Sequence, residues 1–323
     1  MTPGLPPPGP TGIGTSAATL AETSRPARAV AALYCPTAVR THPALAQQVQ
    51  HRLHQWADSL GLPPQAIAGH GQLAVLTHPD TDDPARLTTA AQLLAVGKLI
   101  EAAAPPPPNP PGPAPVLVQA LDIALQEIYD ACDTPHTARH PTPAPSPVTS
   151  DQPALRSALA ALSALPASPY QLDRVRRAYQ ALAAATPTGS GPHPPWEHLS
   201  HAHINAYSPA LTALDAIEGY ELSPAAAAHP DLQRTQHLAA LAAALLQDLA
   251  HPAPTGLTAA IARADRLGTP AATRRAAAIH DDTMHAFHHH ATELAATADP
   301  ATGRYLAALW TWLGGHHTFH TAP

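Results

Sequence analysis

The sequence predicts an all-α fold, and three features of its composition and pattern lead to this prediction. Ala and Leu dominate the apolar residues, which make up 45% of the 323-residue chain, and both residues favour helices. Aromatic residues, which favour strands, amount to only 4%. Apolar side chains recur at helical spacing, and clusters of the 40 prolines divide the chain into separate helices joined by linkers.

The net charge indicates which partners the protein does not bind, and the cysteines indicate the compartment in which we expect it. The formal net charge is −6, from 17 basic and 23 acidic residues. The sequence contains no run of basic residues, which argues against nucleic acid or an anionic membrane surface as the main partner. No apolar run approaches the roughly 20 residues of a membrane-spanning helix, and no signal peptide is recognisable. Cys35 and Cys132 have no metal-binding or redox spacing, so we expect a cytoplasmic protein.

Residues 1–32 are rich in Pro and Gly and are predicted to form a disordered tail. Within it, one large apolar residue, Ile13, lies in a small and flexible setting, as in segments that become ordered on binding a partner. Composition alone leaves a tail without a role equally open. The segment of interest is GPTGIGTS, formed by Gly9, Pro10, Thr11, Gly12, Ile13, Gly14, Thr15 and Ser16.

Residues 33–323 are predicted to form one helical domain. A first helix begins at Pro43, which suits a first turn, and ends at Gly61. A short helix, a polar turn and a longer helix follow over residues 69–104. The apolar stripe of the first helix consists of Val49, Leu53 and Trp56.

The polar turn contains three aspartates, Asp80, Asp82 and Asp83. They have the composition of a metal cluster, but prolines flank them on both sides. Asp83 is well placed to cap the following helix. We therefore interpret the group as a capped turn, with a metal site as the alternative.

The middle of the chain alternates between proline-rich loops and helices. Loops are predicted at residues 105–115 and 134–153, because proline runs interrupt any helix. Helices are predicted at about 116–132, 154–165 and 169–185.

Two helices between Tyr207 and Thr255 are predicted to organise the fold and to floor a central pocket. Gly219 ends the first, where a residue without a Cβ can take the left-handed conformation. Pro252 and Pro254 end the second. Their apolar positions are Leu211, Leu214, Ile217, Leu238, Leu241, Leu245 and Leu249.

Three further helices are expected in residues 258–268, 269–298 and 300–323. On the second of them, side chains of metal-ligand type share one face. Because the chain contains 22 histidines, we interpret this face as solvated, with a transition-metal site as the alternative. The face comprises Asp281, His285, His288 and His289, and a second histidine group comprises His316, His317 and His320.

Seven segments, in this order and at roughly this spacing, make the chain resemble bacterial class I terpene synthases, in particular the 2-methylisoborneol synthase group. The resemblance implies a single α-helical isoprenoid synthase domain around an apolar pocket. Such enzymes ionise a prenyl diphosphate with three Mg²⁺ ions and an arginine. The segments are GPTGIGTSA, LYCPTAVR, HPDTDDPARL, PPWEHLSHAHIN, LDAIEGYELSP, IHDDTMHAFHHHATEL and LWTWLGGHHTFH.

At the positions that the resemblance assigns to metal and diphosphate, most of the expected groups are replaced. Glu101 stands at the first position of the aspartate-rich motif, and Ala202 replaces the diphosphate-sensing arginine. The Arg-Tyr pair expected after the last helix is not found before Pro323. The second metal motif, which has Asn, Ser or Thr, and Glu in the family, reads Gln247, His251 and Thr255.

The resemblance therefore predicts a catalytically inactive homologue, for which we assign no catalytic residue and expect no cofactor. Its tail resembles the segment that loads such synthases into encapsulin nanocompartments, which would make the chain a cargo or a partner of an active terpene synthase, as a homodimer or a heterodimer. One alternative is an active synthase that converts geranyl or 2-methylgeranyl diphosphate with Mg²⁺ held by Glu101, Gln247 and His251. A second alternative is a terpenoid-binding protein.

Overall fold

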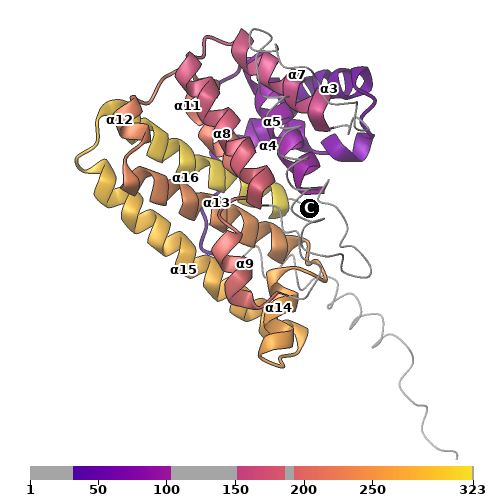
Figure 1. Ribbon diagram of the computed structural model, residues 1–323, viewed down its shortest axis with the longest axis vertical. Coiled ribbons are helices and arrows are strands. Elements are labelled where there is room, and N and C mark those ends of the chain that lie inside the picture. The colour runs from indigo at the N-terminus through magenta and orange to yellow at the C-terminus, as the bar shows by residue number, and fades with distance from the viewer. Residues whose placement is uncertain (1–31, 103–150, 186–192, 322–323) are drawn as a thin grey trace, which may run out of the picture.

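The computed structural model describes residues 32–102, 151–185 and 193–321, and in this part every regular element is a helix, as predicted (Figure 1). None of these helices is both long and apolar enough to cross a membrane. The helices of the first half are α3 (Pro43–Ser59), the 3-10 helix η1 (Pro64–Ile67), α4 (His70–Thr77), α5 (Pro84–Ala102), α7 (Asp151–Ala164) and α8 (Pro169–Ala185). Those of the second half are α9 (Pro195–His201), α10 (Ser208–Thr212), α11 (Leu214–Glu218), α12 (Pro224–Ala227), α13 (Pro230–Ala250), α14 (Leu257–Ala264), α15 (Thr269–Ala295) and α16 (Pro300–Thr321).

Several predictions fall outside the described residues. These are the tail up to residue 31, the loop at 105–115 and the helix at about 116–132. The loop predicted at 134–153 is wrong at its end, because α7 already begins at Asp151. Proline is tolerated in the first turn of a helix, so Pro153 fits α7.

The boundaries of the first helices are confirmed, and so is the capped turn. Helix α3 begins at Pro43, and Gly61 follows it with a φ of +66°. The N–H of Ala85 donates to Asp83 Oδ1 at 2.8 Å, which caps α5. Asp82 instead pairs with Arg40. The aspartates of this turn therefore serve local structure.

The first helix of the organising pair is divided, which corrects the sequence prediction. It forms α10 and α11, which meet at Ala213. Distant side chains take over backbone carbonyls at this break: the hydroxyl of Tyr305 donates to Leu211 O at 2.9 Å, and Arg174 Nη2 donates to Thr212 O at 3.2 Å. Carbonyls satisfied in this way do not need a continuous helix. As predicted, Gly219 ends α11 in the left-handed conformation, and α13 stops at Ala250.

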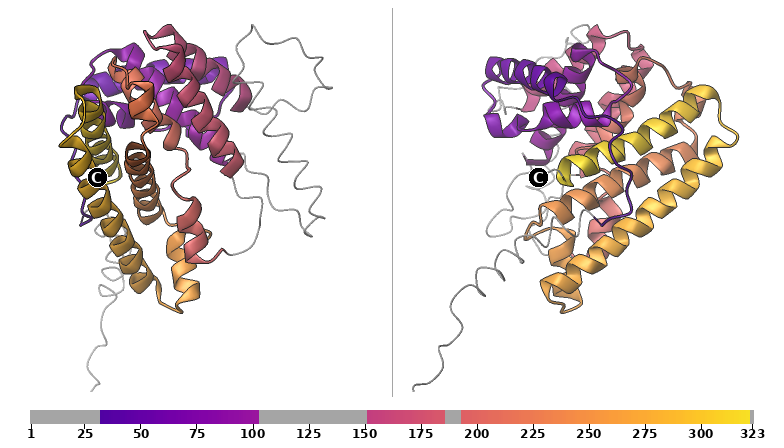
Figure 2. Two further views of the ribbon diagram at one scale, coloured as in Figure 1. Left: turned by 60° about the vertical axis from the view of Figure 1, so that its left-hand side comes forward. Right: turned by 180° about the vertical axis from the view of Figure 1, so that it is seen from behind.

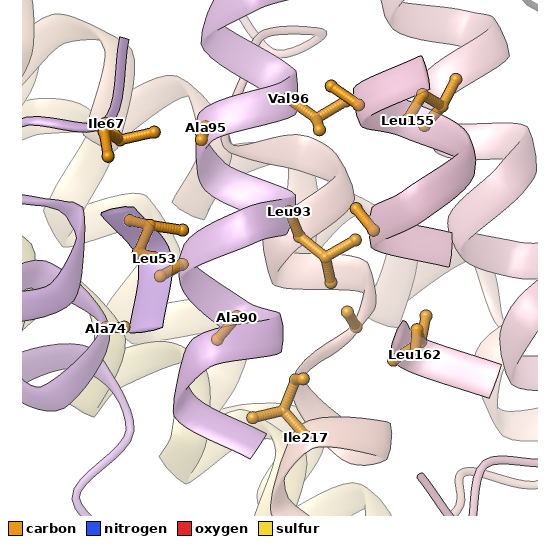
Figure 3. Packing of buried hydrophobic residues seen from close by; sticks show 14 of the residues in the cluster. Leu53, Ile67, Ala74, Ala90, Leu93, Ala95, Val96, Leu155, Leu162 and Ile217 are labelled. Atoms are coloured by element: carbon orange, nitrogen blue, oxygen red, sulfur yellow. The ribbon is translucent and has the colours of Figure 1, made fainter. Parts of the chain in front are cut away.

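Helix α5 is the centre of the first hydrophobic core. Small side chains such as Ala90 and Ala95 let α3 and α4 approach it on one side, while Leu93 and Val96 point towards Leu155 of α7 on the other (Figure 3). All of these side chains are buried. Burial of this kind is the main stabilising term for helices that are individually marginal.

The second core joins α13, α15 and α16, the long helices that run side by side in Figure 2. It contains the larger rings of the protein, including Tyr207, Phe287, Tyr305 and Trp312, which are at most 3% exposed. Two of these rings connect α16 to α10: Trp312 meets the Tyr207 ring at a centroid distance of 5.5 Å, and the Tyr305 hydroxyl donates to Leu211 O.

Helix α5 and the segment before α10 are in backbone contact at Gly97. A Cβ on this residue would collide with the carbonyl oxygen of Ala206. Gly97→Ala should therefore force the two segments apart and lower the free energy of unfolding by about 2–4 kcal/mol, as overpacking does. Chemical denaturation monitored by circular dichroism measures this loss.

Gly303 in α16 provides the matched control, because a Cβ there would meet no atom within 4 Å. Gly303→Ala should be neutral or stabilising by up to about 1 kcal/mol, since alanine favours the helix. If Gly97→Ala were as stable as Gly303→Ala, the close contact between α5 and Ala206 would be disproved.

Candidate functional site

The predicted site residues lie at the ends of three helices. Glu101 is in the last turn of α5, Ala202 directly follows α9, and Gln247 is in the last turn of α13. His251 ends α13, and Thr255 lies exposed in the loop after it. The structure brings Glu101 and Gln247 together through a residue that the site prediction omitted.

That residue is Lys98, the only lysine of the chain. Its Nζ donates to Gln247 Oε1 at 2.7 Å and to Glu101 Oε2 at 3.1 Å. The same Nζ lies 4.2 Å from the centre of the Tyr207 ring, which is cation–π distance. Burial lowers the pKa of Lys98, while the neighbouring Glu101 carboxylate opposes this shift. A carboxylate, an amide oxygen and a ring face all favour the charged ammonium.

The remaining oxygen of Glu101 and the hydroxyl of Tyr207 complete this cluster. Glu101 Oε1 accepts the N–H of Ala206 at 2.6 Å. The Tyr207 hydroxyl donates to Gln247 Oε1, so that this amide oxygen accepts from two side chains. Burial, and secondarily the charge of Glu101, raises the pKa of Tyr207 well above its usual range, and the phenol stays a neutral donor. We call Lys98, Glu101, Tyr207 and Gln247 the lysine cluster.

Next to the lysine cluster, three imidazoles form a chain from α13 to α16. His251 Nε2 lies 3.2 Å from His320 Nδ1, and His320 Nε2 lies 3.2 Å from His316 Nε2. The His316 ring is fully buried and stacks on Trp312 with a centroid distance of 5.1 Å. It also meets the Tyr207 ring edge to face at 4.6 Å. Rings therefore occupy the space beside the lysine cluster.

Burial holds two of these imidazoles, His316 and His320, neutral. It lowers the pKa of His316 well below its usual range, with further contributions from His320 and Lys98. The pKa of His320 is lowered to about 4 by burial first, and then by His251 and Lys98. The site thus has one fixed positive charge, on Lys98, surrounded by neutral rings.

Asp248 and Ala202, which lie beside or at positions that the resemblance singles out, make local hydrogen bonds. Asp248, the acidic neighbour of Gln247, accepts the N–H of Thr258 at 3.0 Å and its hydroxyl at 2.9 Å, and so caps α14. Ala202 has no polar side chain, and its carbonyl accepts from Asn205 Nδ2 at 2.7 Å. Neither residue is directed at a shared ion.

These residues do not fit the magnesium ions that the resemblance implies. Mg²⁺ requires oxygen ligands in near-octahedral geometry. The two suitable side chains, Glu101 and Gln247, already bind Lys98, and Glu101 also binds a backbone N–H. The other motif positions offer an alanine, an imidazole within a histidine chain and an exposed threonine.

The second candidate metal set lies on α15, where Tyr34 engages three of its four members. Asp281 Oδ1 accepts the N–H of Tyr34 at 2.8 Å, the His285 ring stacks on the Tyr34 ring at 4.0 Å, and His288 Nδ1 lies 2.7 Å from its hydroxyl. His289 is directed at Glu293 at 3.4 Å. Across the described ranges, no group of three or more His, Cys, Asp or Glu side chains is arranged to hold a metal ion. No local pattern in the sequence indicates this role of Tyr34.

Two hollows of appreciable size lie away from the lysine cluster. One, of about 670 Å³, is lined by α3, η1 and α4, including His54, Gln72 and Val75. The other, of about 480 Å³, lies between α8, α10, α12 and α13 and is lined by residues such as Arg177 and His237. Neither hollow is lined by a residue of the lysine cluster.

Comparison with known proteins agrees with this arrangement of helices. The chain is 30% identical to a 2-methylisoborneol synthase of Saccharopolyspora erythraea over 311 residues, covering 89% of this chain and 87% of the relative. It is 30% identical to one of Streptomyces ambofaciens, covering 97% and 78%. The crystal structure of the Streptomyces coelicolor 2-methylisoborneol synthase with Mg²⁺ and geranyl-S-thiolodiphosphate matches with a TM-score of 0.74 at 24% identity, covering 90% of this chain and 95% of that one. No protein-family model matches the sequence.

The all-helical architecture is thus that of the class I terpene synthases. Within that class, the chain belongs to the family of 2-methylisoborneol synthase, as a homologue at about 30% identity over nearly its full length.

The buried imidazoles make the stability of the protein depend on pH. Because the pKa of His320 is about 4 when folded and ordinarily 6.5, the unfolded chain binds an additional proton between these values. The contribution of neutral His320 to the free energy of unfolding is therefore fully present above pH 6.5 and is lost as the pH falls through 4. His320→Gln should flatten the dependence of unfolding free energy on pH over this window by about 1–3 kcal/mol.

The measurement is a series of urea denaturations between pH 7.5 and 4. His285→Gln, which changes an exposed histidine of α15, is the matched control and should keep the wild-type slope. An unchanged slope in His320→Gln would show that this imidazole is not held neutral in the folded protein.

Proposed function

We propose that this chain is a non-catalytic homologue of 2-methylisoborneol synthase that acts by association with other proteins. One observation carries the first part of the proposal: the Lys98 ammonium bridges Glu101 and Gln247, the two positions best suited to hold metal in this sequence. A terpene synthase fold with this centre keeps the shape of the family without the groups that start its chemistry.

The electrostatics support the loss of catalysis. Departure of a diphosphate requires fixed positive charge where its negative charge develops. Here the one ammonium is paired with a carboxylate, Ala202 stands where the resemblance calls for an arginine, and the neighbouring imidazoles are neutral. These residues therefore present no unpaired positive charge to a leaving diphosphate.

The second part of the proposal rests on the sequence. Residues 9–16 resemble an encapsulin cargo-loading segment, although they lie outside the described residues. A chain that retains this segment while it lacks the metal ligands fits a cargo protein, or a partner of an active terpene synthase, better than an isolated enzyme.

We expect no turnover of geranyl diphosphate or 2-methylgeranyl diphosphate by the purified protein in Mg²⁺ or Mn²⁺. Gas chromatography of extracts measures terpene products, and a coupled assay measures released diphosphate. The 2-methylisoborneol synthase of Streptomyces coelicolor serves as the active control. Turnover that Glu101→Ala or His251→Ala abolishes would overturn the proposal and establish the alternative, an active synthase with an altered metal set.

Association is tested separately, by co-expression with an encapsulin shell protein. The full chain should co-elute with the assembled shell on size-exclusion chromatography, and deletion of residues 1–31 should abolish this. Ile13→Asp should weaken loading, because it places a charge on the one large apolar side chain of the segment, whereas Thr11→Ser is the conservative control. Equal loading of all four proteins would refute a role for the tail.

A further inference from the structure

In the lysine cluster, a cation of the protein itself lies between two positions that the resemblance assigns to metal, Glu101 and Gln247. We propose that the Lys98 ammonium is a built-in cation that joins Glu101 to Gln247, two positions that the resemblance assigns to metal, so that these oxygens are paired without a metal ion. This goes beyond the proposed function, because it assigns a structural role that an active or an inactive protein could use.

The contacts of Lys98 connect three separate parts of the chain. Lys98 and Glu101 belong to α5, Gln247 belongs to α13, and the ring of Tyr207 belongs to the segment that leads into α10. An ammonium has three hydrogens. Two of its sides face Glu101 Oε2 and Gln247 Oε1, and another faces the Tyr207 ring. The side chain is thus held from three directions, as a bound ion would be.

The second oxygen of Glu101 extends the same connection. It accepts the N–H of Ala206, next to the close contact between Gly97 and the Ala206 carbonyl. The carboxylate therefore joins Lys98 to the backbone before α10. In the described part of the chain, Lys98 is the one cation within ion-pair distance of Glu101. Without it, a half-buried carboxylate would lose its counterion.

The residue type at position 98 supports this bridging role, because an arginine would not bridge the two oxygens in the same way. All other basic residues of the chain are arginines, and the single lysine stands at this position. An ammonium is a compact point charge that fits between two oxygens, whereas a guanidinium is broad and planar. Lys98 Nζ lies within hydrogen-bond distance of both Glu101 Oε2 and Gln247 Oε1.

The experiment measures thermal unfolding of the full chain with and without divalent ions. The Tm of the wild type should be the same in EDTA and in millimolar Mg²⁺ or Mn²⁺. Lys98→Met, which retains the length of the side chain, should lower the Tm by roughly 1–3 °C, because Lys98 and Glu101 are partly exposed and solvent weakens the pair.

A double-mutant cycle shows whether Glu101 is the partner. In a Glu101→Gln background, Lys98→Met should lower the Tm by less than half as much, because the neutral amide needs no counterion. Arg177→Met is the matched control: it removes an exposed cation that pairs with Asp173 on the surface of α8, and it should behave the same in both backgrounds. Equal losses from Lys98→Met in the two backgrounds would overturn the proposal.

Removal of the built-in cation should also expose its oxygen ligands to metal. Lys98→Ala leaves Glu101, Gln247 and Tyr207 around a space, and millimolar Mn²⁺ should raise the Tm of this variant by a few degrees. Titration of Mn²⁺ followed by electron paramagnetic resonance measures the binding directly, with Lys98→Ala/Glu101→Ala as the control that should bind none.

Two further results would contradict the proposal: stabilisation of the wild type by Mg²⁺ or Mn²⁺, or a Lys98→Met variant as stable as the wild type. Failure of the proposed function is a different result, because turnover by the wild type would refute inactivity without changing the response of Lys98 variants to metal.

Discussion

The contact of Lys98 with Gln247 and Glu101 is the constraint on which the centre of this fold depends. Most buried side chains of α5 belong to the first core, whereas those of α13 belong to the second core and to a third around Leu249 and Ile261. The last turns of the two helices are joined by the bond from Lys98 to Gln247. Polar side chains at such a meeting point must be paired, because leaving them unsatisfied costs about 1–3 kcal/mol each. One ammonium satisfies the carboxylate of one helix and the amide of the other, and Tyr207 closes the remaining side.

The sequence could predict most of the helices, because their ends are set by local chemistry. Proline at Pro43, the cap at Asp83 and the left-handed Gly219 each act within a few residues, and each is found as predicted. The division into α10 and α11 was missed for the opposite reason. It depends on Tyr305, whose hydroxyl accounts for a carbonyl 94 positions away in sequence, and no local pattern records such a bond.

The site was predictable only in part, for a related reason. A comparison of motif positions shows which residue stands at each ligand position, and it names Glu101 and Gln247, which the structure brings together through Lys98. Such a comparison does not show that Lys98 lies between these two positions. The signal was nevertheless present, since the single lysine of the chain stands three residues before Glu101, one helical turn away. Recognising it would have required the knowledge that α13 lies opposite.

The same arrangement is the physical basis of our proposal that this chain does not perform the chemistry of its relatives. Each charge at the centre is internally compensated: Lys98 offsets Glu101, and burial keeps His316 and His320 neutral. A compensated centre is stable without ligands, because no charge is left unpaired in a poorly solvated place. A leaving diphosphate needs fixed positive charge where its negative charge develops. In the proposed function, the charge of Lys98 is not available for this task, because Glu101 and Gln247 already bind it.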